Sequence, residues 1–142
     1  MPTEPPEATA LEEAVAQVGD RWTLLVVNSL LDGPRRFNEL LGGMTGLAPN
    51  VLSKRLRHLE VSGLVVATPY TRRPPRFDYR LTATGAELAS ALRLLAHWGS
   101  TGHPDVVPIH HSACGTPVEA RWYCPTCARL VEGDETGDTR FV

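Results

Sequence analysis

Apolar residues recur every three or four positions in five segments of the chain, and they alternate with polar residues in one shorter segment. The first spacing is typical of helices that bury one side, and the second is typical of half-buried strands. Gly19, the pair Gly33-Pro34 and the pair Gly42-Gly43 interrupt the helical pattern and mark the ends of helices. The predicted helices cover about residues 8–18, 22–30, 37–41, 48–62 and 82–98.

The fourth predicted helix, about residues 48–62, has two chemically different faces. One face carries leucines at helical spacing, namely Leu52, Leu56 and Leu59. The opposite face carries amide, hydroxyl and cationic side chains, namely Asn50, Ser53, Lys54 and Arg57. Pro49 suits the first helical position, and Gly63 suits the residue just past the end. A helix that buries leucines while presenting these polar groups is equipped to read base edges in a DNA major groove.

A predicted hairpin follows this helix. Residues 64–68 are apolar, residues 69–76 are rich in proline and arginine, and residues 77–81 alternate between apolar and polar. Short helices, such a hairpin and a closing helix predict an α+β fold. We expect a mainly helical winged helix-turn-helix domain over about residues 8–99, with a two-stranded wing whose tip is 69–76.

The charge of the chain is unevenly distributed. The 142 residues carry a net charge of −2, yet residues 21–80 hold ten basic and four acidic side chains. A local basic surface suits the phosphate backbone of DNA, whatever the total charge. No apolar run is long enough to span a bilayer, and the first residues show no secretory signal, so we expect a cytoplasmic location.

All three cysteines lie near the end of the chain. Cys124 and Cys127 are three residues apart, and His111 precedes Cys114 by the same spacing, so each pair can form a small knuckle. Three thiolates and one imidazole make a tetrahedral structural zinc site. We therefore predict a zinc-ribbon-like segment over about residues 109–132, after a linker at 100–108, with His110 competing with His111 for the fourth position.

Two other interpretations of the cysteines stay open. They could be free thiols on an extended tail, or Cys124 and Cys127 could form a thioredoxin-type redox pair, although no βαβ pattern surrounds them. A closed set of four ligands leaves no position for water, which predicts a structural role rather than catalysis. Because loss of zinc would unfold the segment, sensing of a metal or an oxidant is a further hypothesis.

Five stretches of residues 11–99 together resemble the HxlR-type family of MarR-like winged helix-turn-helix regulators. The matching stretches are VGDRWTLL at 18–25, GPRRFNEL at 33–40, NVLSKRLR at 50–57, PY and PPR within 69–76, and YRLTATG at 79–85. The resemblance implies a transcription regulator without enzymatic activity. It also implies a homodimer on operator DNA, paired through the first and last helices.

Two positions depart from the family pattern. Some members sense oxidants with a cysteine just before the first helix, but this chain has no cysteine before Cys114. The family often places serine before the proline that begins the reading helix, whereas this chain has Ala48. Since alanine offers no side-chain oxygen to the free amides, we expect the missing cap to cost about 1 kcal/mol.

Helix-turn-helix docking predicts a role for each basic or polar side chain of the interface. Early residues of the reading helix reach base edges, which favours Asn50, Ser53, Lys54 and Arg57. We expect Arg55 to hold phosphate, with Arg35, Arg36, Arg72, Arg73 and Arg76 as further contacts to the backbone or minor groove. The predicted core comprises Trp22, Phe37, Leu52, Leu56, Leu59, Phe77 and Tyr79. The alternative function is a zinc-ribbon protein-interaction module on a winged-helix scaffold that does not bind DNA.

Overall fold

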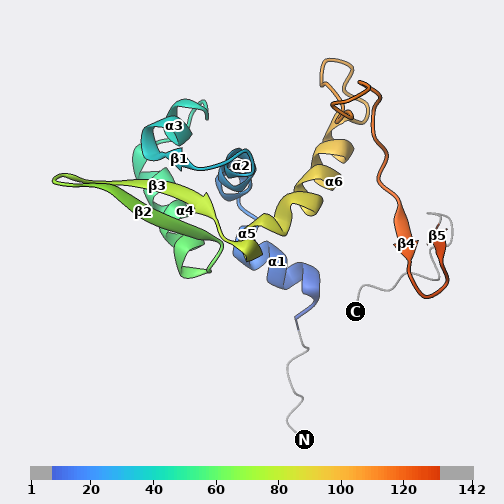
Figure 1. Cartoon of the computed structure of the whole chain (residues 1–142), viewed down its shortest axis with the longest axis horizontal. Coiled ribbons are helices and arrows are strands. Elements are labelled where there is room, and N and C mark those ends of the chain that lie inside the picture. Colours follow the sequence, from blue (N-terminus) through green and yellow to red (C-terminus); the bar gives the residue numbers. More distant parts are fainter. Residues whose placement is uncertain (1–7, 132–142) are drawn as a thin grey trace, which may run out of the picture. The chain divides into compact units, whose positions relative to one another are not determined.

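In a computed structural model of the protein, residues 8–131 are described, and they divide into two compact units (Figure 1). One unit is Glu13–Leu92, and the described residues of the other are 8–12 and 93–131. The last residue of the predicted zinc-ribbon-like segment, Glu132, lies outside the described residues. Within residues 8–131, no helix has the length and apolar character needed to cross a membrane.

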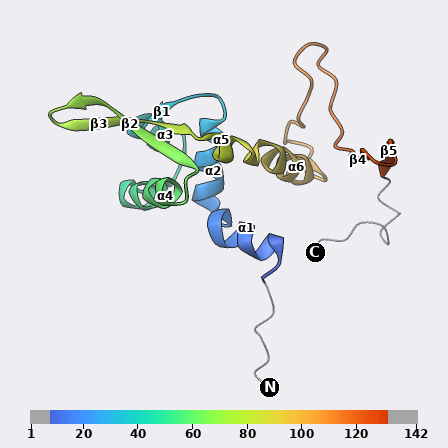
Figure 2. The same ribbon diagram turned by 60° about the horizontal axis from the view of Figure 1, so that its bottom comes forward.

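The helices and strands follow the predicted order closely. The helices are α1 (Ala10–Val18), α2 (Arg21–Leu30), α3 (Phe37–Gly42), α4 (Pro49–Val61), α5 (Ala83–Ala86) and α6 (Leu88–Ser100). The strands are β1 (Arg35–Arg36), β2 (Val65–Arg72), β3 (Pro75–Leu81), β4 (Trp122–Cys124) and β5 (Arg129–Val131). The winged helix-turn-helix fold is confirmed, with α3 and α4 as the helix pair and the β2–β3 hairpin projecting beyond the helices (Figure 2).

The predicted two-stranded wing is the β2–β3 hairpin, but a further strand was missed, because the sheet has three antiparallel strands in the order β1-β3-β2. The third strand is the two-residue β1, which is too short to show any alternation in the sequence and pairs Arg35 with Tyr79. The strands also extend into the predicted turn and leave Arg73 and Pro74 at its tip. Pro69 is tolerated because β2 is an edge strand, and the register shifts between Pro69 and Thr71.

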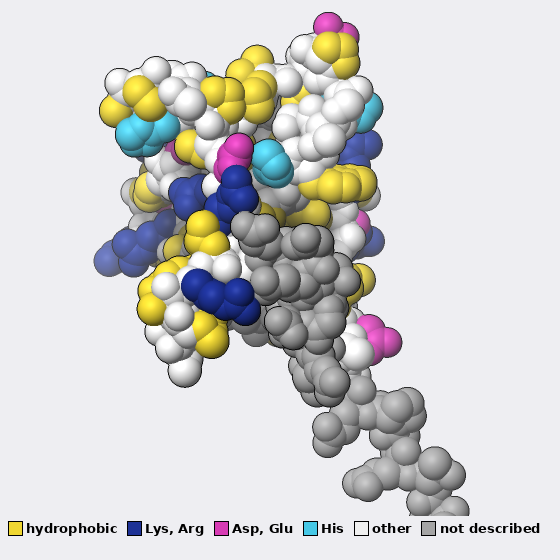
Figure 3. Space-filling view, turned by 90° about the vertical axis from the view of Figure 1, so that its right-hand side faces the viewer, with side chains coloured by type: hydrophobic (Ala, Val, Ile, Leu, Met, Phe, Trp, Pro, Cys, Tyr) yellow, Lys and Arg dark blue, Asp and Glu magenta, His cyan; other side chains and the backbone are white. Residues whose placement is uncertain are grey.

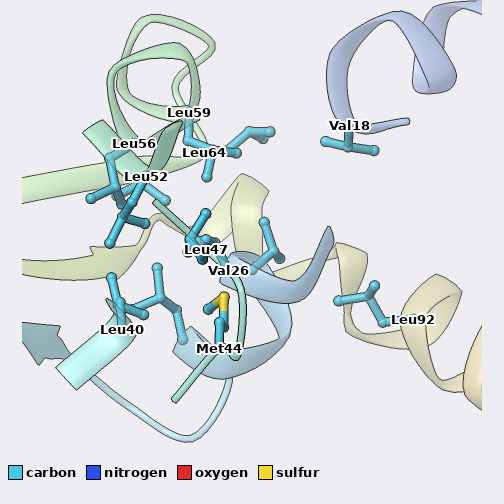
Figure 4. Packing of buried hydrophobic residues seen from close by; sticks show 13 residues of the cluster. Val18, Val26, Leu40, Met44, Leu47, Leu52, Leu56, Leu59, Leu64 and Leu92 are labelled. Atoms are coloured by element: carbon cyan, nitrogen blue, oxygen red, sulfur yellow. The ribbon is translucent and has the colours of Figure 1, made fainter. Parts of the chain in front are cut away.

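The core lies between α2, α3, α4 and the start of β2 (Figure 4). The predicted leucines of α4 are buried, and Trp22, Phe37 and Tyr79 pack against the core while partly exposed. Phe77 was wrongly predicted as core, since 36% of its surface is exposed. Because Phe77 stands on the wing opposite Pro69, its ring lies beside the Tyr79 ring rather than reaching the helices, with the centroids 6.5 Å apart and the planes tilted by 47°.

The predicted closing helix 82–98 divides into α5 and α6, with Glu87 between them. The Thr82 hydroxyl caps α5 by accepting from the Gly85 amide at 3.1 Å, and it also donates to the Gly63 carbonyl at 2.6 Å. These bonds attach the first turn of α5 to the end of α4. Gly85 lies directly against the Leu64 carbonyl, so a side chain at this position has no room.

We expect Gly85→Ala to lower the free energy of unfolding by about 1–3 kcal/mol, because the new methyl group would push against the Leu64 backbone. The matched control is Gly42→Ala, since a methyl group at that helical position meets nothing within 4 Å. The control should leave stability unchanged or raise it by up to about 1 kcal/mol. Urea denaturation followed by circular dichroism measures both variants, and equal midpoints would contradict the close packing of α5 on Leu64.

Candidate nucleic-acid interface

The ends of α4 are set by the residue types that the sequence places there. Pro49 occupies the first turn, and Ala48 precedes it in extended conformation with φ −83° and ψ 146°. No side chain caps this end, which confirms the prediction for Ala48. At the other end, Gly63 adopts φ 72°, a left-handed conformation that glycine adopts readily, and the chain turns from α4 into β2.

The two faces of α4 are separated as predicted. Leu52, Leu56 and Leu59 are buried, and α4 packs on α2 and on the start of β2. The side chains on the opposite face are exposed, namely Asn50, Ser53, Lys54 and Arg57. In the described part of the chain, none of these four makes a side-chain hydrogen bond or an ion pair. They are therefore available to an external partner.

Arg55 has a partner inside the fold. Its Nε lies 2.9 Å from Asp20 Oδ1, and both side chains are about one-third exposed. The same oxygen caps α2 by accepting from the Trp22 and Thr23 amides at 3.0 and 3.1 Å. The pair thus connects α4 to the first turn of α2. A phosphate contact by Arg55 stays a prediction.

A second polar contact of α4 was missed from the sequence. The His58 ring places Nε2 2.7 Å from the Gln17 carbonyl, near the end of α1. The two residues are 41 positions apart, so no local pattern indicates the contact. A ring N–H that donates to this carbonyl satisfies one of the orphan groups at the α1 terminus. Two side chains of α4 therefore contact the junction between α1 and α2. Arg55 contacts Asp20 at the start of α2, and His58 contacts Gln17 near the end of α1.

The arginines of the wing fall into two groups. Arg72, Arg73 and Arg76 are exposed near the tip of the β2–β3 hairpin, as predicted. By contrast, Arg36 pairs with Asp78 at 3.3 Å, and its guanidinium lies 4.2 Å from the centre of the Tyr70 ring. The Nε atom of Arg35 is buried and lacks a hydrogen-bond partner within the described chain. The Arg36 side chain thus helps to hold β1 on the wing, and the DNA contacts of Arg35 and Arg36 stay predictions.

The predicted metal ligands form two separate pairs in the second unit. His111 Nδ1 lies 3.4 Å from Cys114 Sγ, whereas Cys124 ends β4 and Cys127 lies in the turn between β4 and β5. Among residues 8–131, no three histidine, cysteine or acidic side chains gather closely enough to hold a metal. Hydrogen bonds from Thr116, followed by one from His111, lower the pKa of Cys114 to about 7.

Two substitutions of Asp20 separate its two contacts. We expect Asp20→Ala to lower the free energy of unfolding by about 1–2 kcal/mol, since it removes both the helix cap and the partner of Arg55. Asp20→Asn keeps a capping oxygen, so it should cost at most about 1 kcal/mol, the range for an exposed ion pair. Thermal and urea denaturation measure the free energy of unfolding of both variants. If both variants lose the same free energy of unfolding, the Asp20 cap makes no contribution to stability.

Comparisons with known proteins agree with this geometry. The model of the HxlR-like helix-turn-helix family matches residues 17–105. An uncharacterized HTH-type transcriptional regulator of Mycobacterium tuberculosis is 37% identical over 129 residues, which cover 88% of this chain and 81% of the relative. A solved structure described as a transcription factor from Pseudomonas aeruginosa is 29% identical, with a TM-score of 0.69 over 87% of this chain and 86% of that one. A regulator of the MarR family from Enterococcus faecalis is 35% identical, with a TM-score of 0.58 over 71% and 90% of the two chains. The chain therefore belongs to the HxlR-like helix-turn-helix family.

Proposed function

We propose that this chain is a DNA-binding transcriptional regulator that acts as a homodimer, with α4 as the helix that reads the major groove. The observation that carries the proposal is the exposed face of α4, where amide, hydroxyl and cationic side chains stand without partners in the described chain. Family membership supports the same function. Because a bacterial transcription regulator acts on the chromosome, we expect this chain to act in the cytoplasm.

The chemistry of the exposed face assigns a role to each side chain. Asn50 stands in the first turn of α4, where its amide can pair with adenine, and Lys54 or Arg57 can donate to guanine. Ser53 can contact either kind of base edge. The exposed arginines at the wing tip are suited to phosphate or to the minor groove, which lies beside the major groove that α4 enters.

Exposed apolar side chains on α1 and α6 support the dimer. Leu11 and Val15 are 71% and 57% exposed, although they continue the apolar stripe of α1. On α6, Leu95 and Trp98 are 51% and 77% exposed. Large apolar side chains left open to water on two helices mark an interaction surface, and a second copy of the chain presents the same apolar residues.

Arg57→Ala should weaken binding to DNA from upstream of the chain's own gene by about 5- to 150-fold, the range for loss of one base contact of ~1–3 kcal/mol. The melting temperature should stay the same, because Arg57 is exposed and makes no side-chain hydrogen bond or ion pair within the described residues. Fluorescence anisotropy measures the affinity, and calorimetry measures the melting temperature. Unchanged affinity would remove Arg57 from the interface.

Arg121→Ala is the matched control, because it removes the same charge from a side chain that pairs with Glu119 outside the winged helix. It should leave DNA affinity unchanged. For the natural chain, affinity should fall steeply as salt rises, since phosphate contacts release counterions. A protein-interaction module that does not bind DNA would show no such binding at any salt concentration.

Trp98→Glu should convert the dimer into a monomer, because it places a charge on the apolar surface of α6. The control is Val61→Glu, which introduces the same charge at an apolar side chain that is 82% exposed on α4. Light scattering coupled to gel filtration measures the mass of each variant. A monomeric natural chain, or a dimer that persists in Trp98→Glu, would contradict pairing through α6.

A further inference from the structure

The segment after α6 has no core of its own. Within residues 101–131, no residue is buried, and the large apolar side chains Trp122, Tyr123 and Leu130 are each more than half exposed. The β4–β5 hairpin has three residue pairs. Figure 3, which views the molecule from the right-hand side of Figure 1, shows hydrophobic and histidine side chains exposed on that face. A two-stranded hairpin of this size is marginal in water without a covalent or metal cross-link. The three cysteines form no disulfide.

The first pair of donors already has the separation that a metal requires. His111 Nδ1 and Cys114 Sγ are 3.4 Å apart. A tetrahedral zinc ion, with bonds of about 2.3 Å to sulfur and 2.0 Å to nitrogen, holds two such ligands about 3.5 Å apart. The turn closes through amide bonds from Cys114 and Gly115 to the His111 carbonyl, and Gly115 adopts φ 70°.

The second pair repeats this local geometry. Cys124 ends β4, and Cys127 lies three positions later in the turn that leads to β5. Ala128, the residue after the second cysteine, adopts φ 53° and corresponds to Gly115. It is the one non-glycine residue with positive φ in the described chain. Left-handed alanine is disfavoured, so a matching conformation in both turns indicates a shared structural demand.

We propose that the two turns are the halves of one tetrahedral zinc site, in which His111, Cys114, Cys124 and Cys127 of a single chain bind one ion. In both turns the two ligands are three positions apart, and the residue directly after the second ligand has positive φ. Nine residues separate Cys114 from Cys124, which leaves enough chain for the two turns to close on a shared ion. The ion would then replace the missing apolar core of this segment. This site is independent of the DNA-binding function proposed above.

The choice between the two histidines follows from their contacts. His111 faces the Cys114 sulfur. His110 instead has Nδ1 3.4 Å from the Pro108 carbonyl, and its backbone forms a bridge with Pro117. In a β-like segment neighbouring side chains point to opposite sides, so His110 is directed away from the turn that holds Cys114.

Metal analysis of the full chain, purified under reducing conditions, tests the proposal. We expect about one zinc ion per chain by mass spectrometry of the metal. Cobalt substituted for zinc should give the intense visible bands of a tetrahedral site together with sulfur-to-cobalt charge transfer. A preparation without bound zinc after incubation with zinc chloride and dialysis, or a weak octahedral cobalt spectrum, would overturn the site.

Matched variants test the ligands. His111→Ala should weaken zinc binding at least about 10-fold, and Cys124→Ser should do the same, whereas His110→Ala should bind zinc as the natural chain does. Because the winged helix has its own core in Glu13–Leu92, its circular dichroism should persist in all three variants and show that they fold. Loss of zinc in His110→Ala with retention in His111→Ala would overturn the ligand assignment.

Discussion

The burial of one side of α4 is the constraint on which the rest of the winged helix depends. Leu56 and its two neighbours on the stripe pack among α2, α3 and β2, and no alternative face of the helix is apolar enough to replace them. Full burial of each leucine contributes about 1.5–3 kcal/mol. The rotation of α4 about its axis is therefore set by the core, and the polar face is directed outward as a consequence. The outward direction of the polar face, on which the proposed DNA binding depends, therefore follows from the packing of the apolar face of α4.

The contacts between α1, α2 and α4 extend this constraint to the region that we propose for dimerisation. Asp20 begins α2 and also holds Arg55 of α4, while His58 of α4 holds the last turn of α1. The orientation of the reading helix is thus tied to the helix whose exposed side carries Leu11. In a homodimer, the spacing of two reading helices would depend on these links.

Local chemistry explains which features could be predicted from the sequence. The helices, the caps at Asp20 and Thr82, the uncapped Ala48 and the outward face of α4 each depend on residues within one or two turns. The features that were missed depend on contacts between distant residues. Strand β1 forms because β3 lies beside it, and the His58 contact spans 41 positions. Phe77 is apolar and alternates correctly, yet its strand extends past the helices that could have covered it.

In the proposed homodimer, α4 of each chain enters the major groove of operator DNA. Methylation interference on the bound DNA tests this most directly, because the methyl group on guanine N7 blocks the major groove and leaves the backbone intact. We expect interference at guanines in two half-sites that lie one helical turn, ~10 base pairs, apart. Binding that is insensitive to N7 methylation throughout the site would contradict it.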